Sequence, residues 1–196
     1  MKKPVFGKAA ALLHAAVAAL VLSLASCIAD DPAHSDPTYS DPSAGSIGMM
    51  YDGVWKVGQS DNVQGTVIAS ASRFETASIP YADIFRHLFP GCEIEEASSP
   101  SGSVAMPFTV AATADGGLLY SLQPTAWYMT ATVDGKRHSA ALTFVPSGSG
   151  TDDISWGTLS KAGVLTLILH ATAVSIDSGE PSPLSLKIAY TAVRKK

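Results

Sequence analysis

The sequence is poor in cysteine, with only Cys27 and Cys92 among its 196 residues. Two cysteines allow at most one intramolecular disulfide, which excludes a small disulfide-stapled scaffold. Cys92 is followed directly by Glu93, and a neighbouring carboxylate disfavours the thiolate that a catalytic cysteine needs. The fold must therefore depend on the packing of a hydrophobic core, and Cys92 is not expected to be a nucleophile.

Recognisable catalytic motifs are absent as well. The sequence contains no Gly-x-Ser-x-Gly elbow, no phosphate-binding loop and no dinucleotide fingerprint. Its histidines after the first 30 residues are isolated from one another, and none has the close spacing of a zinc site: His34, His87, His138 and His170. These absences predict a protein that is not an enzyme and that has no catalytic residues, metal or cofactor.

Two acidic clusters are present, one from Glu93 to Glu96 and the other at Asp152-Asp153. Paired carboxylates serve glycoside hydrolysis or calcium binding, but Asp152 lacks the spacing of a calcium loop. We interpret both clusters as solvated charge in loops. Trp156 follows the second cluster, and an exposed indole beside carboxylates suits stacking against a sugar or a peptide. Asp152, Asp153 and Trp156 are thus the candidate ligand contacts; the alternative is that Trp156 folds back onto the end of the domain.

The chain begins with a basic start and a short apolar run. Three lysines precede the apolar residues 9–24, which lead into Leu24-Ala25-Ser26-Cys27. A run of about 16 residues is shorter than the roughly 20 that a membrane-spanning helix needs, and it is typical of a secretion signal. The last four residues have the order that the bacterial lipoprotein-processing machinery reads. We therefore predict that residues 1–26 are a signal peptide and that Cys27 carries lipid; the alternative is an ordinary signal peptide.

Basic charge is scarce beyond this leader. All three leader lysines are lost if residues 1–26 are removed, which leaves ten basic against 17 acidic residues and a net charge of about −7. Nucleic acids and anionic lipid surfaces require a basic face on their partner. The composition therefore excludes nucleic acid as a partner and leaves the lipid on Cys27 as the expected membrane attachment.

Residues 27–50 have the composition of a tether. Asp-Pro occurs three times, and Ser, Ala and Gly fill much of the remainder, so the segment holds too little apolar surface to form a core. Asp30-Asp31 lies just after the predicted lipid site. Acidic residues there resemble the export signal of lipoproteins of the Bacteroidetes type, which implies a location on the outer membrane, exposed at the cell surface.

Residues 51–196 are predicted to form a single β domain. Nine segments are predicted to be strands, most of them because apolar and polar residues alternate and 118–122 because it is a short apolar run: 54–57, 63–70, 73–79, 104–113, 118–122, 127–133, 136–145, 164–176 and 184–193. Asp134-Gly135 marks a hairpin turn, and residues 80–89 have helical spacing between two prolines. We predict an all-β fold, an antiparallel meander of eight or nine strands that closes into a barrel, with one short helix; the alternative is a two-sheet sandwich.

Two resemblances follow from particular residues. Gly53-Val54-Trp55, together with Arg194 near the end of the last strand, resembles the calycin pattern, in which an arginine covers a tryptophan at the barrel floor. Ile79-Pro80 running to Leu88, and Leu122-Gln123-Pro124, resemble a family of uncharacterised Bacteroidetes lipoproteins. The first implies Trp55 and Arg194 as a structural pair in a lipocalin-like barrel. The second implies location and a β fold, because that family has no assigned activity.

The leading hypothesis is a lipid-anchored surface lipoprotein whose β domain is a non-enzymatic binding module. Its expected partners are a glycan, a peptide or another envelope protein, and we expect the protein to be a monomer. Two alternatives stay open: a carrier that holds a small apolar molecule inside the barrel, and a structural or pilus-type assembly subunit.

Overall fold

The computed structural model describes residues 48–147 and 154–193. Several predictions fall outside these ranges and have no structural counterpart here: the signal segment 1–26, the lipidation of Cys27, most of the tether, and the positions of Asp152, Asp153 and Arg194. Within the described ranges the chain forms eleven strands and one helix.

The elements follow one another with short connections. In chain order they are β1 (Met49–Val57), β2 (Val63–Ala69), β3 (Arg73–Thr76), α2 (Tyr81–Leu88), β4 (Ile94–Ser98), β5 (Val104–Ala112), β6 (Leu118–Leu122), β7 (Trp127–Val133), β8 (Lys136–Phe144), β9 (Trp156–Leu159), β10 (Val164–Ile176) and β11 (Ser182–Val193).

Eight of the strands close into an antiparallel barrel. The hydrogen-bonded order is β11-β1-β2-β3-β5-β6-β9-β10, and β10 pairs with β11 to complete the ring. β10 and β11 stay in register from Val164↔Val193 to Ala171↔Leu186, which makes this the longest pairing in the barrel. The predicted all-β barrel is confirmed, and the two-sheet sandwich is not the arrangement observed.

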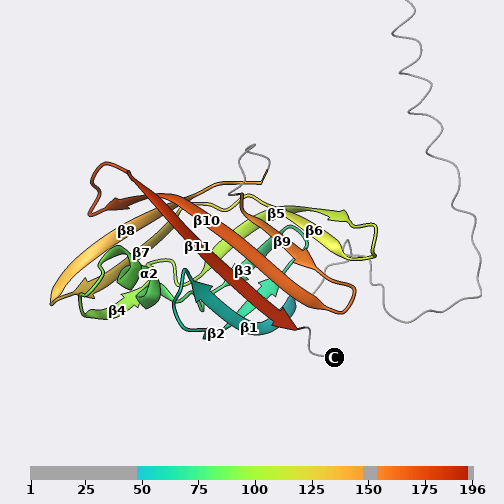
Figure 1. The fold of residues 1–196 in the computed structure, drawn as a ribbon, viewed down its shortest axis with the longest axis horizontal. Helices are drawn as coiled ribbons and strands as arrows, with labels where there is room; N and C mark the ends of the chain where they lie inside the picture. The colour runs from blue at the N-terminus through green and yellow to red at the C-terminus, as the bar shows by residue number, and fades with distance from the viewer. Residues whose placement is uncertain (1–47, 148–153, 194–196) are drawn as a thin grey trace, which may run out of the picture. The chain divides into compact units, whose positions relative to one another are not determined.

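Strand β10 belongs to two sheets at once. Its first half, Leu165–Ile168, pairs with β9, and its second half, Ala171–Ile176, pairs with β8. A bulge between Ala171 and Ala173 marks the change of partner. Beyond it β4, β7 and β8 form, with the end of β10 and the start of β11, a second part of the sheet that we call the side sheet (Figure 1).

Hydrogen bonds from a buried serine hold the point where the two sheets part. Ser155 is fully buried. Its hydroxyl accepts a hydrogen bond from the His170 N–H at 3.2 Å, and its own N–H donates to the carbonyl of Val145. Buried backbone groups that leave a ladder need such partners. The branch point is therefore a built feature of the fold and not a frayed strand end.

The short helix lies where the sequence predicted one. Helix α2 occupies Tyr81–Leu88, directly after Pro80, and packs against β4 and β7 of the side sheet. Ile84 and Phe85 are fully buried, and Phe89 stacks on Phe85 with 6.1 Å between ring centroids. The aromatic stripe of this helix thus fills the core, as expected from its spacing.

The barrel interior is filled with large side chains. Alternate residues of each strand face inward, and those at the centre are fully buried and aromatic or aliphatic: Tyr51, Trp55, Phe74, Met106, Leu165, Leu167 and Tyr190. Phe74 lies 4.6 Å from Phe108 and 4.9 Å from Tyr120, measured between ring centroids. The described part of the barrel is therefore packed and not hollow.

Three local features differ from the sequence prediction. Strand β3 ends at Thr76, three residues early, because the chain there bonds to β2 through side chains. Strand β4 has two exposed glutamates and a bulge, so it shows no alternation. Strand β9 has only four residues and contains Gly157, so its sequence cannot be distinguished from the polar loop that precedes it.

None of the helices described is long and apolar enough to span a membrane.

Candidate binding site at the seam between β2 and β3

Trp156, the predicted ligand contact, belongs to strand β9. It pairs with Ser121 of β6 and with Ile168 of β10, and it is only partly exposed. Its neighbours in the chain, Ser155 and Gly157, are buried, so strand alternation directs the indole to the outer face of the barrel. Its proposed companions Asp152 and Asp153 lie outside the described residues, and the three are not seen together.

Trp55 occupies the barrel core, next to a tyrosine. Its ring centroid lies 4.7 Å from that of Tyr190, and its indole N–H has no hydrogen-bond partner among the described residues. The Tyr190 hydroxyl donates to the carbonyl of Tyr51 at 2.6 Å, and burial raises the pKa of this phenol to about 12. Tyr190 thus packs against the tryptophan, whereas Arg194, the partner that the calycin pattern implies, lies outside the described ranges.

Among the described strands of the barrel, the neighbours β2 and β3 share the fewest backbone pairs. Strand β2 pairs with β1 over all seven of its residues, but it pairs with β3 only at Ile68↔Glu75 and Ala69↔Phe74. Towards the start of β2, the chain that follows β3 moves away and no other strand takes its place. The sheet is therefore closed by two backbone pairs at one end of this seam and by side chains further along.

Hydroxyl groups replace the missing ladder around Thr66. The Thr66 N–H donates to the Ser78 hydroxyl oxygen at 2.7 Å, and the Thr66 carbonyl accepts from the hydroxyls of Thr76 at 2.7 Å and Ser78 at 3.1 Å. Thr76 is almost fully buried. Both backbone groups of Thr66 are thus satisfied without a neighbouring strand, as buried polar groups require.

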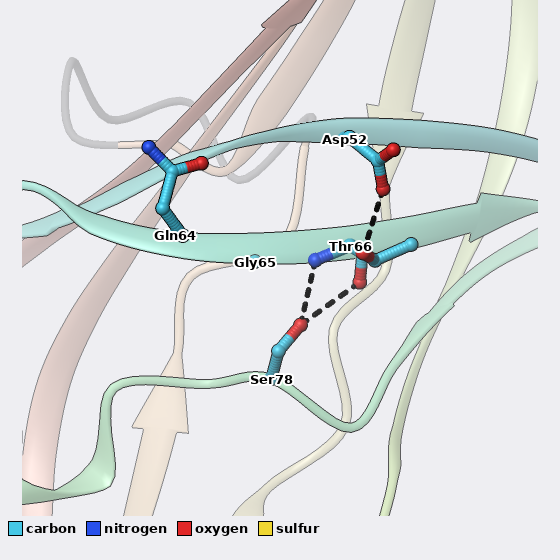
Figure 2. A pocket seen from close by; sticks show the side chains of 5 residues that line it. All are labelled: Asp52, Gln64, Gly65, Thr66 and Ser78. Carbon is cyan, nitrogen blue, oxygen red and sulfur yellow. Dashed lines mark hydrogen bonds between the residues drawn. The ribbon is translucent and has the colours of Figure 1, made fainter.

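An open depression lies on the outer surface at this point. It has a volume of about 490 Å³ and is lined by Asp52, Gln64, Gly65, Thr66 and Ser78. Figure 2 shows the Thr66 hydroxyl beneath Asp52, to which it donates at 2.8 Å, and Ser78 on the loop below β2. The lining offers a carboxylate, an amide and two hydroxyls, which can bind a polar ligand or a peptide backbone.

A second depression, of about 380 Å³, adjoins the first and shares Thr66 and Ser78 with it. Its lining is more apolar and includes Ile68 and Ala77. Ile68 pairs with Met50 across the β1–β2 ladder, and both side chains are exposed, at 38% and 61%. The two depressions together form a groove along the seam, which we call the seam groove, with a polar end at Gln64 and an apolar end at Ile68.

At the polar end of the seam groove, strand β2 contains Gly65, which has no side chain to separate the groove from the barrel core. A Cβ atom at Gly65 would lie 2.5 Å from Trp55 Cδ1 and 3.0 Å from Ser78 Oγ, so no larger residue fits between the indole and the seam. The tryptophan therefore supports the seam groove from inside, although it does not line it.

The described residues do not show a catalytic arrangement. No group of three His, Cys, Asp or Glu side chains among them is placed to hold a metal ion. His138 Nδ1 lies 2.7 Å from Asp177 Oδ2, but no hydroxyl or thiol in the described ranges is hydrogen-bonded to that ring. The pKa of the Cys92 thiol is raised, chiefly by its hydrogen bond to Asp134. The seam groove offers hydrogen-bonding groups beside an apolar lining, which suits the binding of a ligand.

Comparison with known proteins adds no further information on function. No protein-family model, curated protein or solved structure matches this chain. The seam groove is thus interpreted from its own residues.

Sequence reasoning did not identify the residues of the seam groove. Asp52, Gln64 and Thr66 are ordinary polar residues on the outer face of strands, and Ser78 lay inside a predicted strand. The available signal was the hydroxyl pair Thr76 and Ser78 just before Pro80. A strand that runs into proline must stop donating hydrogen bonds, and side-chain hydroxyls can then serve its neighbour.

Proposed function

We propose that this protein is a lipid-anchored lipoprotein of the bacterial cell envelope, and that its β-barrel domain is a non-enzymatic binding module exposed at the outer-membrane surface. The observation that carries the proposal is Leu24-Ala25-Ser26-Cys27, followed by the Asp/Pro-rich tether. A lipid at Cys27 and a tether of about 20 residues would hold a folded domain close to the membrane and leave its outer face accessible.

The packed barrel favours binding on the outside. Carriers of small apolar molecules hold the ligand within the barrel, but here Trp55, Phe74 and Tyr190 occupy that space and are fully buried. The seam groove offers exposed polar and apolar groups on the outer wall. This contrast supports a binding module over an internal carrier.

An assembly subunit is the second candidate function. It is favoured by one observation, the short pairing of β2 with β3, because subunits of strand-exchange assemblies need an incomplete sheet edge that accepts a strand from a neighbour. Polymerisation of the purified protein would favour this candidate. A strictly monomeric protein would favour the binding module.

Metabolic labelling with a palmitate analogue tests the anchor. The wild-type protein should take up the label and fractionate with the outer membrane, and Cys27→Ala should lose the label completely. Cys92→Ala is the matched control, because Cys92 lies within the folded domain, and it should keep the label. A Cys27→Ala protein that still carries the label would contradict the proposal.

Protease treatment of intact cells tests the exposure of the domain. A surface-exposed domain should be shaved from the cells by added protease, while a periplasmic marker protein stays intact. A domain that is cleaved only after the outer membrane is permeabilised would contradict the surface location, but not the anchor.

A further inference from the structure

The start of β2 is an open sheet edge. From Val63 to Gly65 the strand has a neighbour on one side only, since its pairing with β3 begins at Ile68. Val63 and Gln64 are exposed. An edge of this kind presents backbone groups that another strand can use.

The hydrogen-bond pattern shows which backbone groups face outward. Thr66 directs its N–H and carbonyl away from β1, because both bond to the hydroxyls of Thr76 and Ser78. In an antiparallel ladder, residues two apart face the same side, and the register from Met49↔Ala69 to Trp55↔Val63 is unbroken. The N–H and carbonyl of Gln64 therefore face away from β1 too, and no described residue bonds to them.

We propose that this open edge at Gln64 binds one extended peptide strand of a protein partner by β-strand addition. The inference rests on the proposed binding function and names the chemistry of the partner. The incoming strand lies beside Val63 to Gly65 at the polar end of the seam groove, before the point where Ser78 bonds to Thr66, and exchanges two backbone hydrogen bonds with Gln64. In this position it extends the ladder of β2 towards the strand's start, beyond the pairing with β3.

The edge lacks the features that keep other edges from pairing. The open part of β2 has no charged residue, no proline and no bulge, although these are the devices by which natural sheets protect an edge. The depression beside Gln64 is open to solvent on the outer surface of the barrel. The edge is thus suited to accept a strand.

Charge around the groove indicates one end of the partner strand. Asp52 lines the polar end and Asp61 is exposed just before β2, whereas Glu75 at the apolar end forms an ion pair with Arg73 at 2.6 Å. The domain as a whole is acidic as well. A strand with a basic residue at the end near Asp52 and Asp61, and with β-branched residues along its length, complements this surface.

The test uses the full chain in detergent and a defined probe, the seven-residue peptide Lys-Val-Thr-Val-Thr-Val-Lys with both ends blocked. We expect saturable binding to the wild type, measured by fluorescence anisotropy of a labelled peptide. Gln64→Pro removes the N–H that the peptide needs. It leaves the β1–β2 ladder intact, because proline is tolerated where the N–H faces away from the neighbouring strand. We expect at least about a tenfold loss of affinity.

Gln64→Ala is the matched comparison, since it also loses the side-chain amide but keeps the N–H; it should bind the peptide clearly more tightly than Gln64→Pro, and the difference between the two variants reports the backbone donor alone. N-methylated peptides provide a test that leaves the protein unchanged, should Gln64→Pro not fold. Methylating alternate residues along one edge of the peptide should abolish binding, and methylating those along the other edge should not.

Three outcomes would overturn the inference: no binding of the peptide to the wild type, equal binding by Gln64→Pro, or equal loss with both sets of N-methylated peptides. A concentration-dependent dimer that is lost in Gln64→Pro and that excludes the peptide would also overturn it, because the edge would then bind a second copy. Palmitate labelling at Cys27 is independent of Gln64, so failure of this inference and failure of the proposed anchor are distinguishable.

Discussion

Two edges of the described sheet are built in opposite ways. Strand β4, at the end of the side sheet, pairs with β7 through a bulge between Glu95 and Ser98, and Glu96 there has a φ of +48°. The start of β2 is regular and uncharged, and its Gln64 backbone is open. Natural sheets use bulges and charge to prevent pairing at edges. The contrast indicates that β4 is protected and that β2 is left available.

The largest expected effect on stability comes from removing the core side chain that lies behind the open edge of β2. Trp55 supports β2 beneath Gly65, and Trp55→Ala should lower the free energy of unfolding by about 3–5 kcal/mol, because it empties the centre of the barrel. Urea denaturation followed by far-UV circular dichroism measures this change.

Tyr128→Ala is the control for this substitution. Tyr128 is 65% exposed on β7 of the side sheet, and its removal should alter stability by no more than about 0.5 kcal/mol. Similar losses from both substitutions would contradict the packed barrel described above.

A smaller effect is expected from removing the hydroxyl that covers the backbone of β2 at Thr66, where the open edge ends. Ser78→Ala removes the hydroxyl that accepts from the Thr66 N–H, and it should cost about 1–2 kcal/mol because a half-buried donor loses its partner. The Thr66 amide should then exchange with solvent faster. Ser101→Ala, in the exposed loop before β5, should leave stability and that exchange rate unchanged.

The β4 edge contains one residue with a strained backbone, Glu96, and replacing it should change the stability of the protein. Glu96→Gly should stabilise the protein by about 0.5–1 kcal/mol, since glycine adopts a positive φ without the steric cost that Glu96 bears. Glu95→Gly, one residue earlier and without a positive φ, should destabilise it by a similar amount. Changes of the same sign in both variants would contradict the backbone account of this edge.

The smallest effect concerns the attachment of β4 at acidic pH. Asp134 accepts a hydrogen bond from the Glu93 N–H at 2.8 Å, and this bond, followed by that of the Cys92 thiol, lowers the pKa of Asp134 from its ordinary value of 3.8. A lowered folded-state pKa stabilises the fold above the unfolded value, and the gain is lost as pH falls through the folded value.

Stability should therefore decrease slightly more in the wild type than in Asp134→Asn as the pH is lowered from 5 towards 2. Urea midpoints measured across that range test this difference. Identical pH profiles for the two proteins would show that the carboxylate does not contribute.

The sequence predicted the parts of the fold that repeat. Alternation and one short apolar run identified nine of the strands, Asp134-Gly135 identified the β7–β8 hairpin, and two prolines bounded the helix near 80–89. It could not show that β10 serves two sheets, because the partner change depends on a bulge at Ala171 and on the buried Ser155, far away in the chain. The same limit applies to the seam groove. Asp52, Thr66 and Ser78 meet only because β3 ends at Thr76, and that ending depends on tertiary hydrogen bonds.

Amide hydrogen exchange at Gln64 tests the central claim most directly. In the free protein we expect Gln64 to exchange rapidly, while its neighbours Val63 and Gly65, which bond to β1, are protected. Added Lys-Val-Thr-Val-Thr-Val-Lys peptide should slow exchange at Gln64 and leave the β4 amides from Ile94 to Ser98 unchanged. A Gln64 amide already protected in the free protein, or protection by the peptide at β4 and not at β2, would contradict the account.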